Sequence, residues 1–229
     1  MSTIILNIDT ALEEATVSIS ENGKLLHQIS NPNQKDHASF LHPAIKKILD
    51  TNGYAASNIN AIAVTLGPGS YTGLRVGLAA AKGLCYAWGK PLIGIGTLQV
   101  LAASVREYAE GIAQAVICPM IDARRMEVFT ALMNMEGQYT VEPCAMILNE
   151  NSFDDLLNQH PIIFTGNGAP KFQDITKHRN AHFYQHNNLT SSLAALSLQN
   201  WQQQSFIDIH LSEPLYVKEH ESMAGIKKS

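Results

Sequence analysis

The first thirty residues combine a continuous apolar run with two segments in which apolar and polar positions alternate. Residues 3–9, rich in Ile and Leu, predict a buried strand, and residues 15–20 and 24–30 alternate on either side of Asn22-Gly23. Asn-Gly between alternating segments is a strong hairpin signal, because both residues tolerate the positive φ angles of a tight turn. The chain therefore opens with three consecutive strands.

The pattern then changes to the period of a helix. Residues 36–50 predict a helix that stops at Asn52-Gly53, and strand 61–66, helix 74–88, strand 91–95 and helix 98–108 follow. The order β-β-β-α-β-α-β-α predicts an α/β fold, in which a mixed sheet carries helices on its faces. The apolar positions of the first helix are Phe40, Leu41, Ala44, Ile45, Ile48 and Leu49.

A second, weaker copy of this series begins near residue 113. Strands 115–121 and 127–133, a third strand within 137–148, a short helix 152–157 capped by Ser152, strand 161–165, turn 166–168 and helix 192–203 are predicted. We expect an N-terminal lobe over residues 1–108, a smaller second lobe over 109–213 and a polar tail over 214–229. Whether the final helix returns to the first lobe is left open.

Composition narrows the class of protein. The 229 residues carry a net charge of −4 and no block of five like charges, so the electrostatic footprint of a stand-alone nucleic-acid binder is missing. Any RNA is therefore expected to be held through a partner. The three cysteines have no metal or redox spacing. Since the first residues lack a basic export region and no later apolar run reaches about 18 residues, we expect a cytoplasmic protein with no membrane contact.

The sequence GPGSYTGLRVG at residues 67–77 joins a strand to a helix, an arrangement that aims backbone N–H groups at an anion. It matches no generic phosphate loop: no Lys follows Gly73 as in Walker A, Thr72 stands where G-x-G-x-x-G needs a third glycine, and the serine spacing differs from a nucleophile elbow. A phosphate cradle and a tight turn that merely needs glycine stay equally open. The candidate phosphate contacts are Asp9, Thr10, Gly67, Gly69, Ser70, Thr72 and Gly73.

Other polar clusters are weaker candidates. His37 and His42 are five residues apart and diverge on a helix, and His178, His182 and His186 lie in a polar loop, so no metal site is expected. The Asp122–Glu127 turn is more simply explained by an Asp-Arg or Arg-Glu pair that holds a hairpin than by catalysis.

Helix 74–88 is rich in Gly and Ala, which is typical of close packing against a core or against another chain. With helix 38–49 it predicts a partner-docking platform. Its candidate contacts are Leu41, Ala44, Ile45, Ile48, Leu74, Val76, Leu78, Ala80, Ala81 and Leu84.

Four segments together resemble the TsaB (YeaZ) family: Ile8-Asp9-Thr10, residues 67–77, residues 121–129 and the closing residues 214–218. The resemblance implies a two-lobe ASKHA fold (actin-like, sugar-kinase, Hsp70-like) with a reduced second lobe, and marks Arg75, Gly77, Asp122, Arg124 and Glu127 as structural signature positions. Two departures are Tyr71, where the family usually has Phe, and Tyr216-Val217-Lys218, where an Arg usually follows Tyr-Leu.

The resemblance also implies a function. The family supports formation of threonylcarbamoyladenosine (t6A) at position 37 of tRNAs that read ANN codons, as a non-catalytic partner of the transferase TsaD, joined by the ATPase TsaE. TsaD carries a helical His-x-x-x-His, whereas the histidine pair of the predicted helix here, His37 and His42, has four intervening residues. Expected properties are no intrinsic cofactor or metal, a homodimer when alone, tRNA contact only through the complex, and ATP or ADP with Mg near the partner interface. The alternatives are a small ASKHA-type ATPase or phosphotransferase using Asp9 and the glycine turn, and a metallopeptidase, which would need the helical His pair that His37 and His42 do not form.

Overall fold

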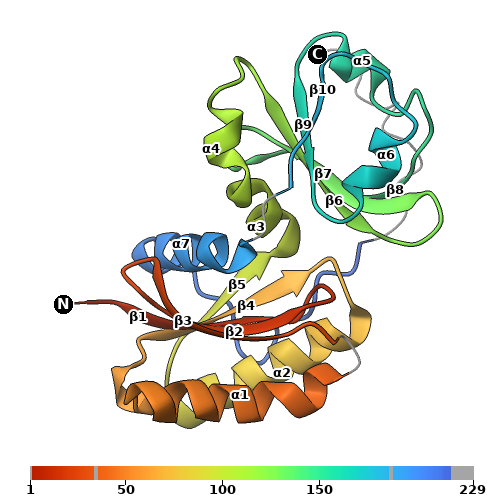
Figure 1. Ribbon diagram of the computed structural model, residues 1–229. Coiled ribbons are helices and arrows are strands. Elements are labelled where there is room, and N and C mark those ends of the chain that lie inside the picture. The colour runs from red at the N-terminus through yellow and green to blue at the C-terminus, as the bar shows by residue number, and fades with distance from the viewer. Residues whose placement is uncertain (1, 34–35, 186–187, 218–229) are drawn as a thin grey trace. The chain divides into compact units, whose positions relative to one another are not determined.

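The computed structural model describes residues 2–33, 36–185 and 188–217, and the chain divides into two compact units (Figure 1). The first is built from the residues up to Val100 together with Asn188–Leu215, and the second begins at Leu101. Each unit contains a five-stranded sheet formed by described residues, with antiparallel and parallel neighbours in both. This agrees with the mixed α/β architecture predicted from the order of elements.

The first sheet has the order β3-β2-β1-β4-β5. β1, β2 and β3 form the predicted antiparallel hairpins, while β4 pairs in parallel with β1 and β5, as helical crossovers require. The strand bounds are β1 Ile4–Asp9, β2 Ala15–Glu21, β3 Lys24–Asn31, β4 Ala61–Gly67 and β5 Leu92–Gly96.

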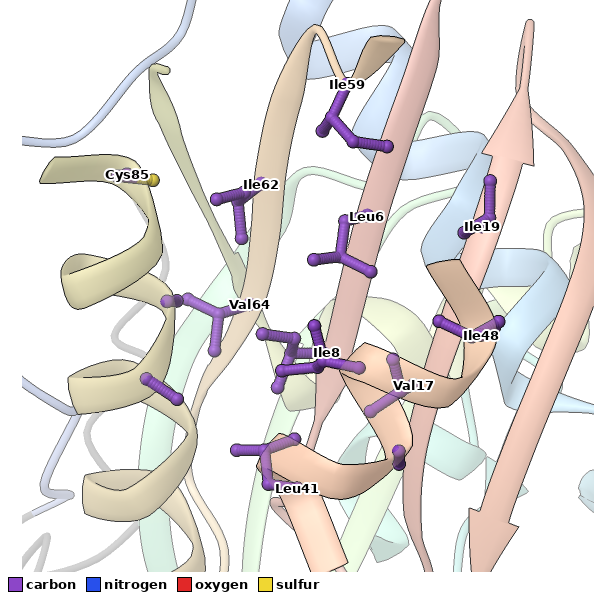
Figure 2. Packing of buried hydrophobic residues seen from close by; sticks show 14 of the residues in the cluster. Leu6, Ile8, Val17, Ile19, Leu41, Ile48, Ile59, Ile62, Val64 and Cys85 are labelled. Carbon is purple, nitrogen blue, oxygen red and sulfur yellow. The ribbon is translucent and has the colours of Figure 1, made fainter. Parts of the chain in front are cut away.

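Helices α1 (His37–Asn52) and α2 (Tyr71–Trp88) cover one face of this sheet, and α7 (Leu189–Gln202) covers the other (Figure 1). A one-turn 3-10 helix, η2 (Ala56–Asn58), precedes β4. Because successive side chains of a strand alternate between faces, Leu6 and Ile8 point into the core beneath α1 and α2. Figure 2 shows these side chains packed with Leu41 and Ile48 of α1 and with Val64 of β4.

A buried polar network attaches α7 to the opposite face. The Ser197 hydroxyl donates to Asn7 Oδ1 at 2.7 Å, and Asn7 Nδ2 donates to Ser20 Oγ at 3.0 Å. Leu193 packs on the same face against Ile5 and Ile93. The final helix therefore belongs to the first compact unit, which was the arrangement left open by the sequence. The first stretch of that unit ends at Val100, eight residues before the expected boundary at 108/109.

The second sheet has the order β10-β9-β6-β7-β8. Its core is a cluster of aromatic rings from Phe153, Phe164, Phe172 and Phe183, with centroids of neighbouring rings 4.9–6.3 Å apart. The bounds are β6 Val116–Asp122, β7 Glu127–Met133, β8 Tyr139–Ile147, α5 Asp154–Leu157, β9 Ile162–Thr165, α6 Ala169–Gln173 and β10 Ala181–Phe183.

Several local expectations were wrong. The predicted helix 98–108 is two helices, α3 (Thr97–Ser104) and α4 (Arg106–Ala109), separated at Val105. Ser152 does not cap α5, because its hydroxyl accepts the N–H of Asn149 and the helix begins two residues later. The short elements α6, β10 and η2 were missed. Among the described residues, no helix is both long and apolar enough to cross a membrane.

Candidate functional site

The glycine-rich segment runs from the end of β4 into α2. Gly67 has a φ of +113°, a conformation that side chains disfavour, and a Cβ there would meet the Leu215 carbonyl oxygen at 2.9 Å. Ser70 is the N-cap of α2 and its hydroxyl accepts the Gly73 N–H at 3.2 Å. The Ser70 N–H donates to the Ala11 carbonyl at 2.7 Å. Two backbone N–H groups of the turn, those of Ser70 and Gly73, are thus hydrogen-bonded within the chain.

Three glycines of this segment allow the loop after β1 to approach closely. A Cβ at Gly69 would overlap the Ala11 carbonyl oxygen, one at Gly73 the Thr10 carbonyl oxygen, and one at Gly77 the Thr10 hydroxyl. The Thr10 hydroxyl donates to the Gly73 carbonyl at 2.7 Å, across the same contact. Close backbone packing therefore accounts for these glycines, which favours the tight-turn explanation over a phosphate cradle.

Asp9 ends β1 beside this contact and is only 7% exposed. Its Oδ1 accepts the Ala11 N–H at 3.0 Å and the Thr65 hydroxyl at 2.8 Å. Burial raises the pKa of Asp9 above its usual value, although these two hydrogen bonds oppose the shift. Asp9 therefore holds the loop after β1 through its hydrogen bonds, although burial disfavours its charged form.

The structure brings most of the candidate phosphate contacts together. Thr10 contacts Gly73, and its neighbour Ala11 contacts Gly69 and Ser70 and also binds the Asp9 carboxylate. Gly67 ends β4, whereas Thr72 is exposed on the first turn of α2. Within the described parts of the chain, no three His, Cys, Asp or Glu side chains are grouped as metal ligands. Nucleotide contact at this turn stays a prediction.

The predicted docking residues are mostly core residues, which corrects the residue set. Eight of the ten lie on the inner faces of α1 and α2 and are buried. Val76 and Leu84 are half-buried against the hydrophobic core between these helices and the first sheet. Apolar residues at helical spacing mark the face that binds the protein's own sheet, so the outer face carries other side chains. The eight buried residues are Leu41, Ala44, Ile45, Ile48, Leu74, Leu78, Ala80 and Ala81.

The outer face of α2 carries Tyr71, Arg75, Ala79 and Gly83, at intervals of four residues, and then Tyr86. Tyr71 and Tyr86 are 56% and 77% exposed, and the Arg75 guanidinium lies 4.0 Å from the centre of the Tyr71 ring. A Cβ at Gly83 would meet no atom within 4 Å. Unlike Gly73, Gly83 faces no close neighbour among the residues that the structure describes. The four-residue spacing of these side chains was visible in the sequence, but the sequence did not show that they form the exposed face of the helix.

The turn between β6 and β7 is held by a residue that sequence reasoning missed. Lys171 donates to Asp122 Oδ1 at 2.8 Å and to the Glu127 carbonyl at 3.0 Å. Neither the Asp-Arg pair nor the Arg-Glu pair expected from the sequence is formed among the described residues: Asp122 contacts Arg124 through its backbone N–H, at 2.6 Å, and not through its guanidinium. Desolvation by partial burial acts to raise the pKa of Asp122. The hydrogen bonds from Lys171 and from the Arg124 N–H outweigh it and hold this pKa below its usual value. Lys171 lies 49 residues away in sequence, beyond the reach of local patterns.

The histidines form no site in the described structure. His37, in the first turn of α1, is 2% exposed and its Nε2 lies 3.1 Å from the Glu13 carbonyl oxygen, whereas His42 is exposed. His178 contacts the Asn158 side chain at 3.2 Å. His186 and Lys218, both named from the sequence, lie outside the described residues.

Comparison with known proteins shows which family the chain belongs to. Residues 24–203 match the family model described as TsaD, tRNA N6-adenosine threonylcarbamoyltransferase. A Bacillus subtilis protein named tRNA threonylcarbamoyladenosine biosynthesis protein TsaB is 27% identical, over 96% of both chains. The chain belongs to the TsaB (YeaZ) family, within the wider family that this model describes.

Further TsaB relatives agree with this assignment. The Escherichia coli TsaB is 37% identical over 128 residues, which cover 56% of this chain and 53% of that protein. The structure of YeaZ from Pseudomonas aeruginosa has a TM-score of 0.73 at 22% identity, covering 94% of this chain and all of that one. The TsaB/YeaZ likeness and the two mixed sheets confirm the predicted α/β ASKHA fold.

Proposed function

We propose that the chain is the non-catalytic partner subunit for t6A formation at position 37 of tRNAs reading ANN codons, acting by binding and activating TsaD together with TsaE. The observation that carries the proposal is the match, along 96% of both chains, to a protein named for threonylcarbamoyladenosine biosynthesis. The match of residues 24–203 to the transferase model adds a structural reason, since similar folds often associate through equivalent helices.

The outer face of α2 is the proposed docking surface. Gly83 occupies a helix position where Ala would be about 1 kcal/mol more favourable, and no atom of the described part of the chain lies within 4 Å of where its Cβ would be. Ala79 and Gly83 allow another backbone to approach closely, and Tyr71 and Tyr86 flank them with exposed aromatic surface of the kind enriched at interfaces. The same face serves a second copy of the chain when TsaD is absent.

The turn at residues 67–73 supports a structural role better than catalysis. The Thr10 hydroxyl and the Gly73 N–H, two groups that a phosphate would need, are bound within the chain. ATP or ADP with Mg is accordingly proposed near the partner interface rather than as an intrinsic cofactor. In this proposal, catalysis resides in TsaD.

Reconstitution tests the proposal directly. Threonylcarbamoyl transfer to an unmodified tRNA is measured with TsaD and TsaE, with and without this chain. Transfer that depends on the chain is expected, and equal rates would overturn the proposal. Heat-denatured chain is the control for added protein.

The alternative is a small ATPase or phosphotransferase that uses Asp9, which is favoured by the position of this carboxylate at the end of β1 beside the glycine-rich turn. Steady ATP hydrolysis by the isolated chain, abolished in Asp9→Asn, would support this alternative. Hydrolysis that persists in Asp9→Asn would point to a contaminating enzyme.

A further inference from the structure

The turn between β6 and β7 carries two adjacent arginines in a conformation that arginine disfavours. Arg124 and Arg125 have φ angles of +73° and +46°. Left-handed positions in a hairpin turn usually carry Gly or Asn, because other side chains crowd the backbone there. Folding alone would therefore select other residues at both positions.

Neither guanidinium is used to hold the turn together. The turn is closed by the Glu127 N–H to the Arg124 carbonyl at 3.0 Å and by the Ala123 N–H to the Glu127 carbonyl at 3.1 Å. Among the residues that the structure describes, neither guanidinium has an ion pair or hydrogen bond, and both side chains are exposed. The two charges are thus available to a ligand.

The neighbouring charges leave this position positive. Lys171, rather than either arginine, pairs with Asp122, and its side chain is 16% exposed. The turn and Lys171 together carry three cations, Arg124, Arg125 and Lys171, against the carboxylates of Asp122 and Glu127. Three cations against two carboxylates leave this position with a net charge of +1, whereas the whole chain carries −4.

We propose that Arg124 and Arg125 form an anion-binding site for the phosphodiester backbone of an RNA. The planar guanidinium forks match phosphate oxygens, and two adjacent forks can engage neighbouring phosphates of one strand. The same forks also fit a carboxylate of a partner protein, and the measurement of TsaD binding below separates that ligand from RNA. The choice of tRNA as the RNA rests on the proposed function; the site would be one contact of tRNA on the complex.

The double variant Arg124→Asn/Arg125→Gly tests the proposal without threatening the fold. Both new residues suit left-handed positions, so the variant should melt at the same temperature as the wild type or higher. Binding of an unmodified tRNA is measured over a series of salt concentrations, for the isolated chain at low salt and for the chain with saturating TsaD. We expect affinity for tRNA to fall about tenfold and the slope of log K against log salt to fall by about 1 to 2.

Two further variants show whether a loss of tRNA affinity comes from the guanidinium geometry, from local charge or from a general change in charge. Arg124→Lys/Arg125→Lys keeps the charge but loses the fork, so it should retain the salt slope and lose part of the affinity. Lys177→Gln/Arg179→Gln removes two exposed cations from the same compact unit and should change tRNA affinity less than twofold.

Unchanged tRNA affinity of Arg124→Asn/Arg125→Gly in both arms would overturn the proposal, and so would weaker binding of TsaD with tRNA affinity preserved. An equal loss in the Lys177→Gln/Arg179→Gln control would show a general charge effect and would also overturn it. A transfer rate that does not depend on this chain would overturn the proposed function instead, while the isolated-chain arm still tests the arginine site.

Discussion

Gly73 of α2 lies directly against Thr10 in the loop after β1: a Cβ at Gly73 would overlap the Thr10 carbonyl oxygen, and the Thr10 hydroxyl donates to the Gly73 carbonyl at 2.7 Å. Helix and loop therefore approach at backbone distance. The contact fixes where α2 begins and hence which of its side chains face outward.

Gly73→Ala should destabilise the isolated chain by about 1 to 3 kcal/mol, because the added methyl group must displace the Thr10 backbone. Gly83→Ala is the matched control on the same helix and should stabilise it by about 0.5 to 1 kcal/mol, since its Cβ would meet no atom within 4 Å. Urea unfolding of both variants measures the difference. Equal stabilities of the two variants would contradict the packing explanation.

Ala79→Arg and Gly83→Arg should leave the chain folded and weaken its binding to TsaD, or to a second copy of itself, by at least about tenfold. Both positions are exposed, and a long charged side chain would hold the partner backbone away. Binding is measured by calorimetry, and the self-association of the chain by light scattering. Ala195→Arg, an exposed position on α7, is the control and should bind normally. Wild-type affinity of both α2 variants would exclude this face as the docking surface.

Asp9→Asn should become more stable relative to the wild type as the pH rises. Burial raises the pKa of Asp9 in the folded state, so the unfolded state loses the proton first and wild-type stability falls as pH rises from about the ordinary value of 3.8 through the folded pKa. Asn can still accept the hydrogen bonds from Ala11 and Thr65. Thermal melts across pH 4 to 8 measure the difference. Asp50→Asn, on the exposed side of α1, controls for the loss of one charge.

Lys171→Met should destabilise the chain at neutral pH by roughly 0.5 kcal/mol, since the Asp122 carboxylate that it pairs with is 41% exposed and screened by solvent. The pKa of Asp122 is lowered in the folded state, so the stabilisation is present above its unfolded pKa and is lost as pH falls through the folded pKa. The difference between wild type and variant should therefore shrink at low pH and at high salt, as followed by urea unfolding. A difference that is independent of both would point to lost packing of the lysine stem.

Ser197→Ala should cost about 1 to 3 kcal/mol, because it leaves the buried Asn7 Oδ1 without the Ser197 donor. Ser192→Ala on the same helix is the control and should change stability by less than about 0.5 kcal/mol. Chemical unfolding of both variants tests whether α7 is fastened to the first sheet as described. Equal effects would contradict the importance of the network.

Local patterns predicted the elements that are long enough to show a recognisable hydrophobic period. The three opening strands and helices α1 and α2 were placed within three residues of their observed ends. β10 was missed because a three-residue strand depends on its parallel partner β9 rather than on its own sequence. The break between α3 and α4 was missed because no Gly or Pro marks it.

The candidate site was predicted less completely than the fold. Asp9, Thr10 and the glycine-rich segment were identified, and their proximity follows from the parallel pairing of β1 with β4. Lys171 was missed because its contact with Asp122 joins separate parts of the second unit. The docking residues were chosen by hydrophobicity, and this criterion selected the core.

The sequence by itself determined the longer elements, their order and the family. These depend on hydrophobic periodicity and on glycines placed where the backbone conformation requires them. The tertiary structure decided which face of α2 is outward, that α7 packs on the first sheet, and that the guanidinium groups of Arg124 and Arg125 have no ion pair or hydrogen bond among the described residues. Burial and charge pairing arise from contacts between residues far apart in sequence, and no local pattern contains those contacts.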